Sequence, residues 1–282
     1  MKRLICLLLA LASAFSLCAC GSFAPRMLVS ARQMAALESL RIESVAQIQA
    51  TVGAFGVKMP YAMQLRLLGD VQREPARSAC ELTVSADGGE EKIYFYSAPE
   101  EDGTRRLYLS FDGENWEEYT AEAEERADTA PELTPPGAMD FIKLGIGLSR
   151  LFEESGTVPL EDGEGLVYEG VIPGELLQEA MRNIDSAGKL ETLLPPELAR
   201  ETLALVGEVP VRLVIGQDSL PRTVELDLTE ALREPCAALL RAYLGGFGME
   251  LAIEGLKLTA NFSDFNRVSV SAPVMEAATK ES

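Results

Sequence analysis

Apolar and polar residues alternate with a period of two over much of the first half of the chain. The alternation is clearest in residues 77–86, where Cys80, Leu82 and Val84 share one side of an extended segment and polar residues occupy the other. Similar stretches predict further strands at residues 44–57, 61–71, 92–97, 107–111 and 115–119. Short Gly- and Asp-containing turns separate them, so the pattern predicts an antiparallel meander with one apolar and one polar face.

The second half of the chain mixes helical and strand periods. A spacing of three and four between apolar residues predicts helices at residues 138–154, 173–186, 196–206 and 229–244, in addition to an early helix at residues 24–40. Strands are predicted at residues 165–172, 209–215, 223–228, 249–262 and 267–271. Residues 121–137 are acidic and then Pro-rich, which is typical of a surface linker. Amphipathic helices must cover the apolar face of a large antiparallel sheet, so the fold class is predicted to be α+β.

The N-terminus has the pattern of a secretory leader. A basic start, Met1-Lys2-Arg3, precedes a nearly uninterrupted apolar run at residues 4–17, which is too short to span a bilayer. The run ends in Leu17-Cys18-Ala19-Cys20, which resembles the bacterial lipobox. That resemblance implies cleavage before Cys20, lipidation of Cys20 and anchoring at the extracytoplasmic face of the cell membrane. An ordinary secretory signal and an N-terminal anchor remain the alternatives.

Composition excludes several kinds of chemistry. The chain has no histidine, which removes imidazole bases, histidine metal ligands and Ser-His-Asp or Cys-His catalysis. Its net charge of −19 argues against binding nucleic acid, because neutralising phosphates requires Lys and Arg. The sequence holds no G-x-S-x-G, Walker or EF-hand pattern, so no catalytic residue, metal or cofactor is predicted. The 44 acidic residues lie mostly in turns and on polar faces, which favours a solvated surface over paired catalytic carboxylates.

A few residues keep two interpretations each. The segments around Asp112-Gly113 and Asp162-Gly163 are faintly similar to calcium loops, but a simple turn is favoured for both. Trp116, the only tryptophan, is interpreted as a plug at the end of a sheet, with ligand stacking as the alternative. Cys80 and Cys236 are interpreted as buried thiols at least as readily as a disulfide pair.

The order of these elements resembles the LolA-like superfamily of bacterial lipoproteins, including the LppX/LprG type. The resemblance rests on soft features, namely the early helix leading into strands, the hairpin at residues 107–116, the strands at residues 209–215 and 220–229, and the closing segment at residues 261–266. It implies a curved antiparallel sheet, or half-open barrel, with helices packed on its concave face and acyl chains or lipids bound there. The linker at residues 121–137 and the helical stretch at residues 230–248 depart from it. The superfamily has no catalytic residues to transfer.

The predicted organisation follows from these observations. Residues 1–19 form the signal peptide, 20–25 a lipidated tether, 26–273 a single α+β domain and 274–282 a tail. The favoured function is a monomeric, non-catalytic lipoprotein that binds a lipid or other amphiphile in an apolar cavity. The alternatives are a structural or signalling surface domain with a packed core, and a carboxylate-dependent envelope hydrolase. The predicted lining comes from inward-facing strand positions, with a dry core as the competing interpretation: Met63, Leu65, Leu82, Val84, Phe95, Val211, Leu213, Leu226 and Ile253.

Lipidation of Cys20 is directly testable, because thioether formation to the lipid requires a sulfur nucleophile. Cells that produce the full chain and are grown with a radiolabelled fatty acid should incorporate label into the protein. The Cys20→Ser variant should incorporate none. Equal labelling of the two proteins would contradict the prediction.

Overall fold

A computed structural model describes residues 23–86, 88–99, 105–118, 150–185, 195–244 and 249–273. The leader with Cys20, the linker at residues 121–137 and the tail at residues 274–282 lie outside these ranges. So does most of the helix predicted at residues 138–154. The lipidation site and those segments therefore stay predictions.

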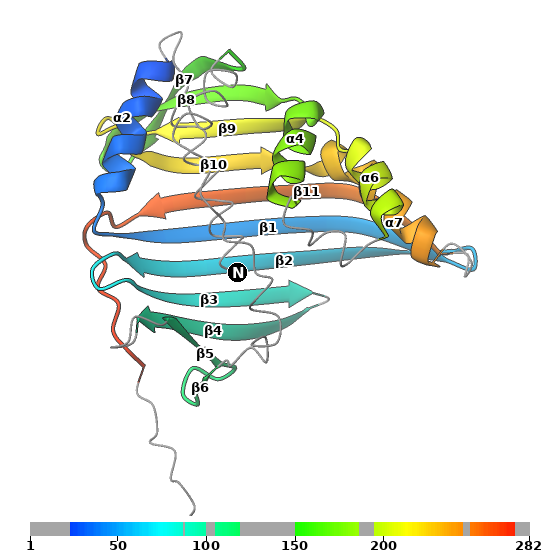
Figure 1. Ribbon diagram of the computed structural model, residues 1–282, viewed down its shortest axis with the longest axis horizontal. Coiled ribbons are helices and arrows are strands. Elements are labelled where there is room, and N and C mark those ends of the chain that lie inside the picture. The colour runs from blue at the N-terminus through cyan, green and yellow to red at the C-terminus, as the bar shows by residue number, and fades with distance from the viewer. Residues whose placement is uncertain are drawn as a thin grey trace, which may run out of the picture. The chain divides into compact units, whose positions relative to one another are not determined.

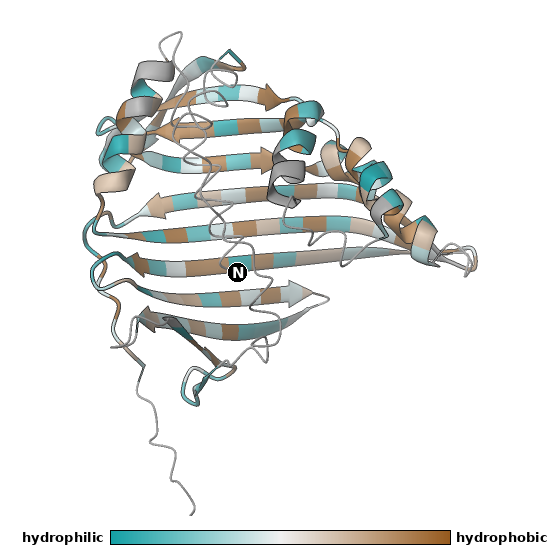
Figure 2. Ribbon diagram, viewed as in Figure 1, coloured by the Kyte–Doolittle hydropathy of each residue, from teal (hydrophilic) through white to brown (hydrophobic). Residues whose placement is uncertain are grey.

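The strands form an eleven-stranded antiparallel sheet in the order β6-β5-β4-β3-β2-β1-β11-β10-β9-β8-β7 (Figure 1). β6 and β7 are its two edges, so the sheet is not closed. A large antiparallel sheet accompanied by a few helices confirms the predicted α+β class. Along many strands the hydropathy of successive residues alternates, as Figure 2 shows.

Contacts within the chain group its residues into two compact units built from interleaved segments. Unit 1 comprises residues 1–36, 48–60 and 131–259, and unit 2 comprises residues 37–47, 61–130 and 260–282. Three strands contribute residues to both units: β1 (Ser39–Ala54), β2 (Val57–Gln72) and β11 (Met249–Ser263). Two compact units therefore share the residues predicted as a single domain, 26–273.

Unit 1 contains all the helices that the structure describes. Its elements are α2 (Phe23–Ala36), β7 (Phe152–Leu160), β8 (Gly163–Ile172), α4 (Gly174–Asp185), α6 (Pro196–Ala204), β9 (Val209–Ile215), β10 (Pro221–Asp227), α7 (Thr229–Leu244), most of β11, and the ends of β1 and β2 that meet in a hairpin. α4 packs against α6, and α6 against α7.

The core of unit 1 is filled by one face of β8, β9 and β10. Val211 lies opposite Leu226, and Leu213 opposite Val224, so all four side chains point to the same side. None of the four exposes more than 8% of its surface. α2 covers the β7–β8 end of this face, where the Phe23 ring stacks on Phe152 at 5.0 Å and meets Tyr168 at 4.7 Å between ring centroids.

Unit 2 is a meander of short-turn strands. It contains β3 (Arg77–Ala86), β4 (Gly89–Pro99), β5 (Arg105–Ser110) and β6 (Glu117–Glu118), with the remaining parts of β1, β2 and β11. Successive strands from β2 to β6 pair antiparallel in direct register. Among its described residues unit 2 contains no helix.

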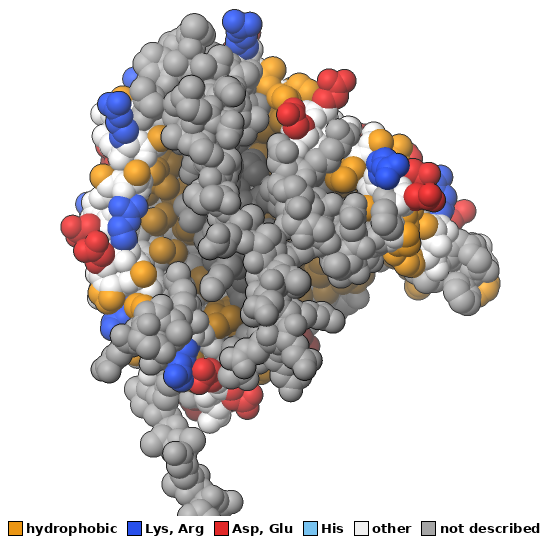
Figure 3. All heavy atoms as spheres, viewed as in Figure 1, with side chains coloured by type: hydrophobic (Ala, Val, Ile, Leu, Met, Phe, Trp, Pro, Cys, Tyr) orange, Lys and Arg blue, Asp and Glu red, His pale blue; other side chains and the backbone are white. Residues whose placement is uncertain are grey.

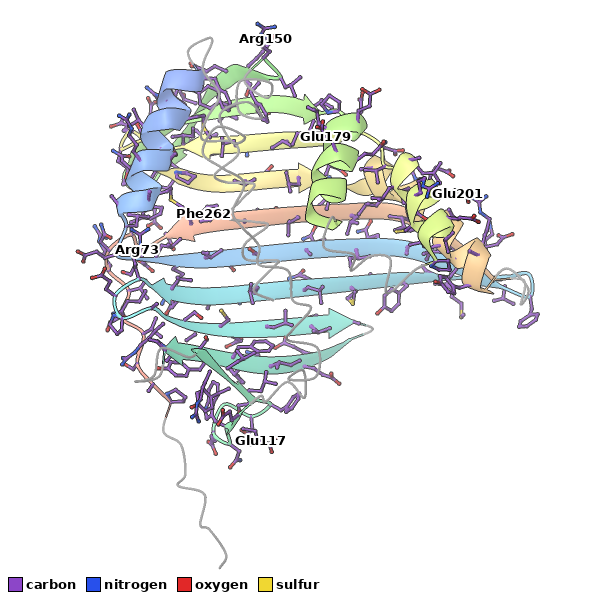
Figure 4. All side chains as sticks on the ribbon, viewed as in Figure 1. Arg73, Glu117, Arg150, Glu179, Glu201 and Phe262 are labelled. Atoms are coloured by element: carbon purple, nitrogen blue, oxygen red, sulfur yellow. The ribbon has the colours of Figure 1, made fainter. Side chains whose placement is uncertain are left out.

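The segment after β11 is held by side chains of unit 2. The backbone N–H of Val268 donates to Ser39 Oγ at 3.1 Å, and that of Val270 to Gln72 Oε1 at 3.0 Å. This segment was expected to be a strand at residues 267–271, and that prediction is wrong, because side chains satisfy the backbone groups that a strand would pair. Phe262, labelled in Figure 4, lies near the end of β11 just before this segment, and its side chain is buried.

The structure also corrects the end of the helix predicted at residues 138–154. The helix predicted to end at Glu154 is wrong over its last residues, because Phe152–Leu160 form strand β7, which the sequence did not predict. A bulge between Glu154 and Gly156 breaks the period-two pattern, and Gly156 adopts φ +149° there. Phe152 is 5% exposed and stacked on Phe23, so tertiary packing decided the conformation that local spacing did not reveal.

Phe23 attaches α2 to β7 and β8 of unit 1, so its removal should strongly destabilise the fold. Phe23→Ala removes two ring contacts and leaves a cavity, so it should lower the free energy of unfolding by about 3–5 kcal/mol. Val29→Ala, on the same helix but 42% exposed, should change it by less than ~1 kcal/mol. Denaturant unfolding followed by circular dichroism measures both. Similar losses in the two variants would show that α2 is not anchored through Phe23.

Candidate functional site

One face of the unit 2 strands carries mostly apolar side chains, with Glu91 opposite Val84 and Ser97 opposite Leu107 as its polar members on β4. The pairing places Leu65 opposite Val84, Leu82 opposite Ile93, and Phe95 opposite Leu109, so these side chains share a side. We call the following nine residues the unit 2 apolar face: Met63, Leu65 and Leu67 of β2, Leu82 and Val84 of β3, Ile93 and Phe95 of β4, and Leu107 and Leu109 of β5.

All nine side chains of this face are half-buried. By contrast, Val209, Val211, Leu213 and Ile215, at alternate positions of β9 in unit 1, are each at most 3% exposed. Every described helix belongs to unit 1, where α2 covers Phe152 and Tyr168. The unit 2 apolar face therefore retains surface that further burial would stabilise.

The opposite side of the same strands carries paired charges. The Arg41 guanidinium contacts Asp70 at 2.7 Å, Arg66 contacts Glu43 at 2.7 Å, and the Lys92 ammonium contacts Glu81 at 2.9 Å. The hydrogen bond from Lys92 lowers the pKa of Glu81. These ion pairs remain partly exposed to water, so most charges of these strands lie on this side. Glu91, which pairs with Val84, is the described carboxylate of β4 on the apolar side, and it is exposed.

Cys80 lies on the apolar side, next to a glycine. A Cβ placed on Gly69 would approach Cys80 Sγ to 3.1 Å, so the sulfur occupies the space that a side chain on β2 would otherwise take. Burial, with a smaller effect of the Asp70 charge, raises the pKa of the Cys80 thiol to about 11. Cys80 and Cys236 are both free thiols, so the alternative of a disulfide between them is not realised.

The residues predicted from sequence to line a cavity fall into two groups. Met63, Leu65, Leu82, Val84 and Phe95 lie in unit 2 and belong to its apolar face. The other four lie in unit 1 and are buried: Val211, Leu213, Leu226 and Ile253.

The sequence analysis missed four members of the face. Leu67, Ile93, Leu107 and Leu109 obey the same alternation as the five that it selected, so the signal was present in the strand period. What was missing was the pairing register, which shows that all nine share one side.

A small cavity of mixed lining lies beside β5 and β6. Its volume is about 180 Å³, and it is lined by the apolar Leu109 and Phe111 together with polar and acidic residues that include Ser110, Asp112 and Glu117. Asp112 Oδ1 accepts the backbone N–H of Asn115 at 2.8 Å and of Glu114 at 2.9 Å, which keeps the pKa of Asp112 well below its usual range. These bonds within the turn confirm its interpretation as a turn. The cavity is smaller than the ~300–1,000 Å³ of ordinary small-molecule sites.

Trp116 closes this same turn. Its half-buried indole donates Nε1–H to the backbone carbonyl of Gly113 at 3.2 Å. The contact agrees with a role at the end of the sheet, while ligand stacking by Trp116 stays a separate hypothesis.

The described ranges lack two further features. No three or more Cys, Asp or Glu residues gather there in an arrangement that could hold a metal ion. No helix in those ranges is both long and apolar enough to cross a membrane.

Comparison with known proteins gives similarities among solved structures. No family model and no curated protein matches the chain. The lipoprotein LppX of Mycobacterium tuberculosis is similar at 12% identity over 87% of this chain and 96% of that one, with a TM-score of 0.38. LprF from Mycobacterium bovis is similar at 11% identity over 88% and 95%, with a TM-score of 0.44. A DUF1329 family protein from Desulfovibrio piger follows at 7% identity over 88% and 94%, with a TM-score of 0.21.

LppX is named in the type of lipoprotein that the sequence resembles. At these identities and TM-scores, neither a ligand nor a functional residue passes from those proteins to this chain.

The raised pKa of Cys80 predicts slow thiol chemistry. A rise from 9.0 to about 11 lowers the thiolate fraction at pH 8 roughly a hundredfold. The test uses a Cys236→Ser variant of the chain that starts at Ser22, in which Cys80 is the remaining thiol. Cys80 should react with a disulfide reagent about a hundredfold more slowly in the folded protein than in the unfolded protein. Its rate should keep rising about tenfold per pH unit from pH 8 towards pH 11. Equal rates in the folded and unfolded chains would contradict the burial of Cys80.

Proposed function

We propose that the protein is a membrane-anchored, extracytoplasmic and non-catalytic lipoprotein that binds the hydrocarbon part of a lipid or other amphiphile on the unit 2 apolar face. The observation that supports this most directly is the contrast between two equally apolar sheet faces. The one in unit 1 is packed, whereas the nine side chains in unit 2 remain half-buried and have no described helix of their own unit over them.

The energetics suit an acyl chain. Each 100 Å² of apolar surface removed from water yields about 2.5 kcal/mol, so covering roughly 200 Å² yields about 5 kcal/mol before ordering costs. A flexible hydrocarbon chain can follow the rows of side chains that antiparallel pairing creates. No directional partner is needed for that kind of binding.

The charge pattern limits what part of a ligand would be bound there. None of the nine residues is ionisable, and the ion pairs of these strands lie on the other side. The carboxylate that shares their side, Glu91 opposite Val84, is exposed and negatively charged. A charged headgroup buried against such a face would lose its hydration without gaining a partner. The bound part is therefore uncharged hydrocarbon, and a polar headgroup stays at the margin of the face.

The described carboxylates do not favour the hydrolase alternative. A general acid that works near neutral pH needs a raised pKa. Where the pKa of a described carboxyl departs clearly from its ordinary value, at Glu81, Asp112 and Asp227, it is lowered. The carboxylates beside the small cavity at β5 and β6 include Asp112, which accepts hydrogen bonds from the backbone of its own turn.

The proposed location at a membrane rests on the lipid anchor at Cys20. Lipidation at Cys20 would hold the chain at a bilayer through the additive burial of methylene groups. A chain with net charge −19 is repelled by anionic headgroups, so the lipid rather than the protein charge would keep it there.

The proposal predicts that ligand binding depends on one side of β3. Val84→Gln places an amide on the unit 2 apolar face and should weaken binding of a fluorescent fatty acid about tenfold, because burying an unpaired polar group opposes the gain from burial. Ser85→Gln, one residue further along β3, places the same side chain on the opposite side and should leave the affinity unchanged.

Both variants are made in the chain from Ser22 onward, which retains every residue that the structure describes. Native mass spectrometry and lipid extraction of this form should also find a co-purifying amphiphile. Absence of any bound lipid, together with no fatty acid uptake and no effect of lipid on thermal stability, would refute the proposed function. In that case a packed structural domain would remain.

A further inference from the structure

The tip of the β1–β2 hairpin exposes large apolar side chains to solvent. Phe55 is 86% exposed, Val57 60% and Met59 54%, which makes them three of the most exposed large apolar residues among those described. They belong to one stretch of five residues, 55–59, at the end of two paired strands. Hydrophobic side chains are visible at the surface on the right of Figure 3, where Figure 1 draws this hairpin and α7.

The backbone of the turn does not favour an aromatic residue. β1 ends at Ala54 and β2 begins at Val57, so Phe55 and Gly56 form a two-residue turn. Both have positive φ, +52° at Phe55 and +81° at Gly56, as hairpin turns of this length require. Asn, Asp or Gly normally occupy the first position, because a bulky side chain is strained there. An exposed Phe at that position therefore contributes nothing to folding that Asn would not supply better.

The exposed side chains continue into an apolar row along β2. Val57, Met59 and Tyr61 alternate with Lys58 and Pro60, and the same period leads to the residues of β2 in the unit 2 apolar face. The hydroxyl of Tyr61 donates to Met63 Sδ at 3.6 Å, so these two neighbours in the row point to one side. Every second side chain of β2 from Val57 to Leu67 is apolar or aromatic.

The charges of the tip differ from those of the chain as a whole. Lys58 is the only charged residue in the stretch 51–60, although acidic residues outnumber basic ones 44 to 25 overall. The acidic groups near its base are Glu250, whose Cβ would lie 3.4 Å from a Cβ at Gly53, and Glu254, which is hydrogen-bonded to Thr51. Within the described ranges no carboxylate pairs with Lys58. The tip is thus apolar with one cation, in a protein that is otherwise repelled by anionic surfaces.

We infer that this hairpin tip docks into the surface of a lipid bilayer, and that the apolar row of β2 guides the hydrocarbon chain between the bilayer and the protein. The second part rests on the proposed function. Aromatic and aliphatic side chains flanked by Lys are suited to the interface between headgroups and acyl chains. Three protruding side chains expose roughly a few hundred Å², well below the ~800 Å² per partner of a stable protein interface. A bilayer needs no shape-matched surface, so it is the occupant that such a small tip fits.

A tryptophan reporter tests docking independently of any ligand. In a Trp116→Phe background, the full-length chain carrying Phe55→Trp is reconstituted into vesicles of phosphatidylcholine and phosphatidylglycerol that contain brominated lipids. Its fluorescence should be quenched and shifted to the blue. The matched control is Phe111→Trp, which replaces another exposed aromatic residue, 74% exposed, in a loop of unit 2. The control should remain unquenched.

Phe55→Asn separates a docking role from a structural one. Asn suits the turn better than Phe, so this variant should unfold at the same temperature as the parent or at a higher one. It should nevertheless take up a fluorescent fatty acid from vesicles about tenfold more slowly, while the amount bound at equilibrium is unchanged. Phe111→Asn should leave both the rate and the amount unchanged.

Several outcomes overturn the inference. An unquenched Phe55→Trp reporter would do so, and a blue shift that depends on protein concentration without lipid would assign the tip to a second copy of the chain. Equal uptake rates for Phe55→Asn and the parent would refute the guiding role. If the parent protein takes up no fatty acid but its reporter is quenched, the proposed function fails while the docking tip stands.

Discussion

The opposite orientation of successive side chains in an antiparallel sheet is the constraint on which this structure depends. It gives each strand one apolar and one polar side, and the apolar side must leave water by packing on something. Unit 1 meets this requirement with helices, as Phe23 of α2 does against Phe152 and Tyr168. In unit 2, where no helix is described, the same requirement is only half met, and the protein keeps apolar side chains partly in contact with water.

The polar side of unit 2 explains why its strands nevertheless keep a fixed orientation. Arg41–Asp70 and Arg66–Glu43 join β1 to β2, and Lys92–Glu81 joins β4 to β3. Each exposed pair contributes little stability by itself. A register slip by one residue would, however, place these charges on the apolar side at a far larger cost. The ion pairs and the apolar face therefore favour the same pairing register of these strands.

The β1–β2 hairpin is long because both of its strands are long. β1 and β2 have 16 residues each and β11 has 15, against the five or six that are usual for globular proteins. These three strands contribute to both units, so their alternation must satisfy both. Along β2 the apolar period continues beyond the residues that packing protects, which is why Val57 and Met59 are exposed. The unusual length thus links the two observations from which ligand binding and bilayer docking were inferred.

The sequence by itself determined the features that depend on local period and turn chemistry. Strands such as Arg77–Ala86 and Val209–Ile215, the helix Thr229–Leu244 and the turn at Asp112 follow from alternation, helical spacing and Asx chemistry. Only the tertiary structure decided which apolar positions are packed and which are left half-buried. Val211 and Val84 have the same alternating pattern, yet one lies in a core and the other on an incompletely covered face, because burial depends on which segment packs across the sheet. For the same reason β7 was missed, since its bulge hides the strand period and its first residue, Phe152, packs on Phe23, which is remote in sequence.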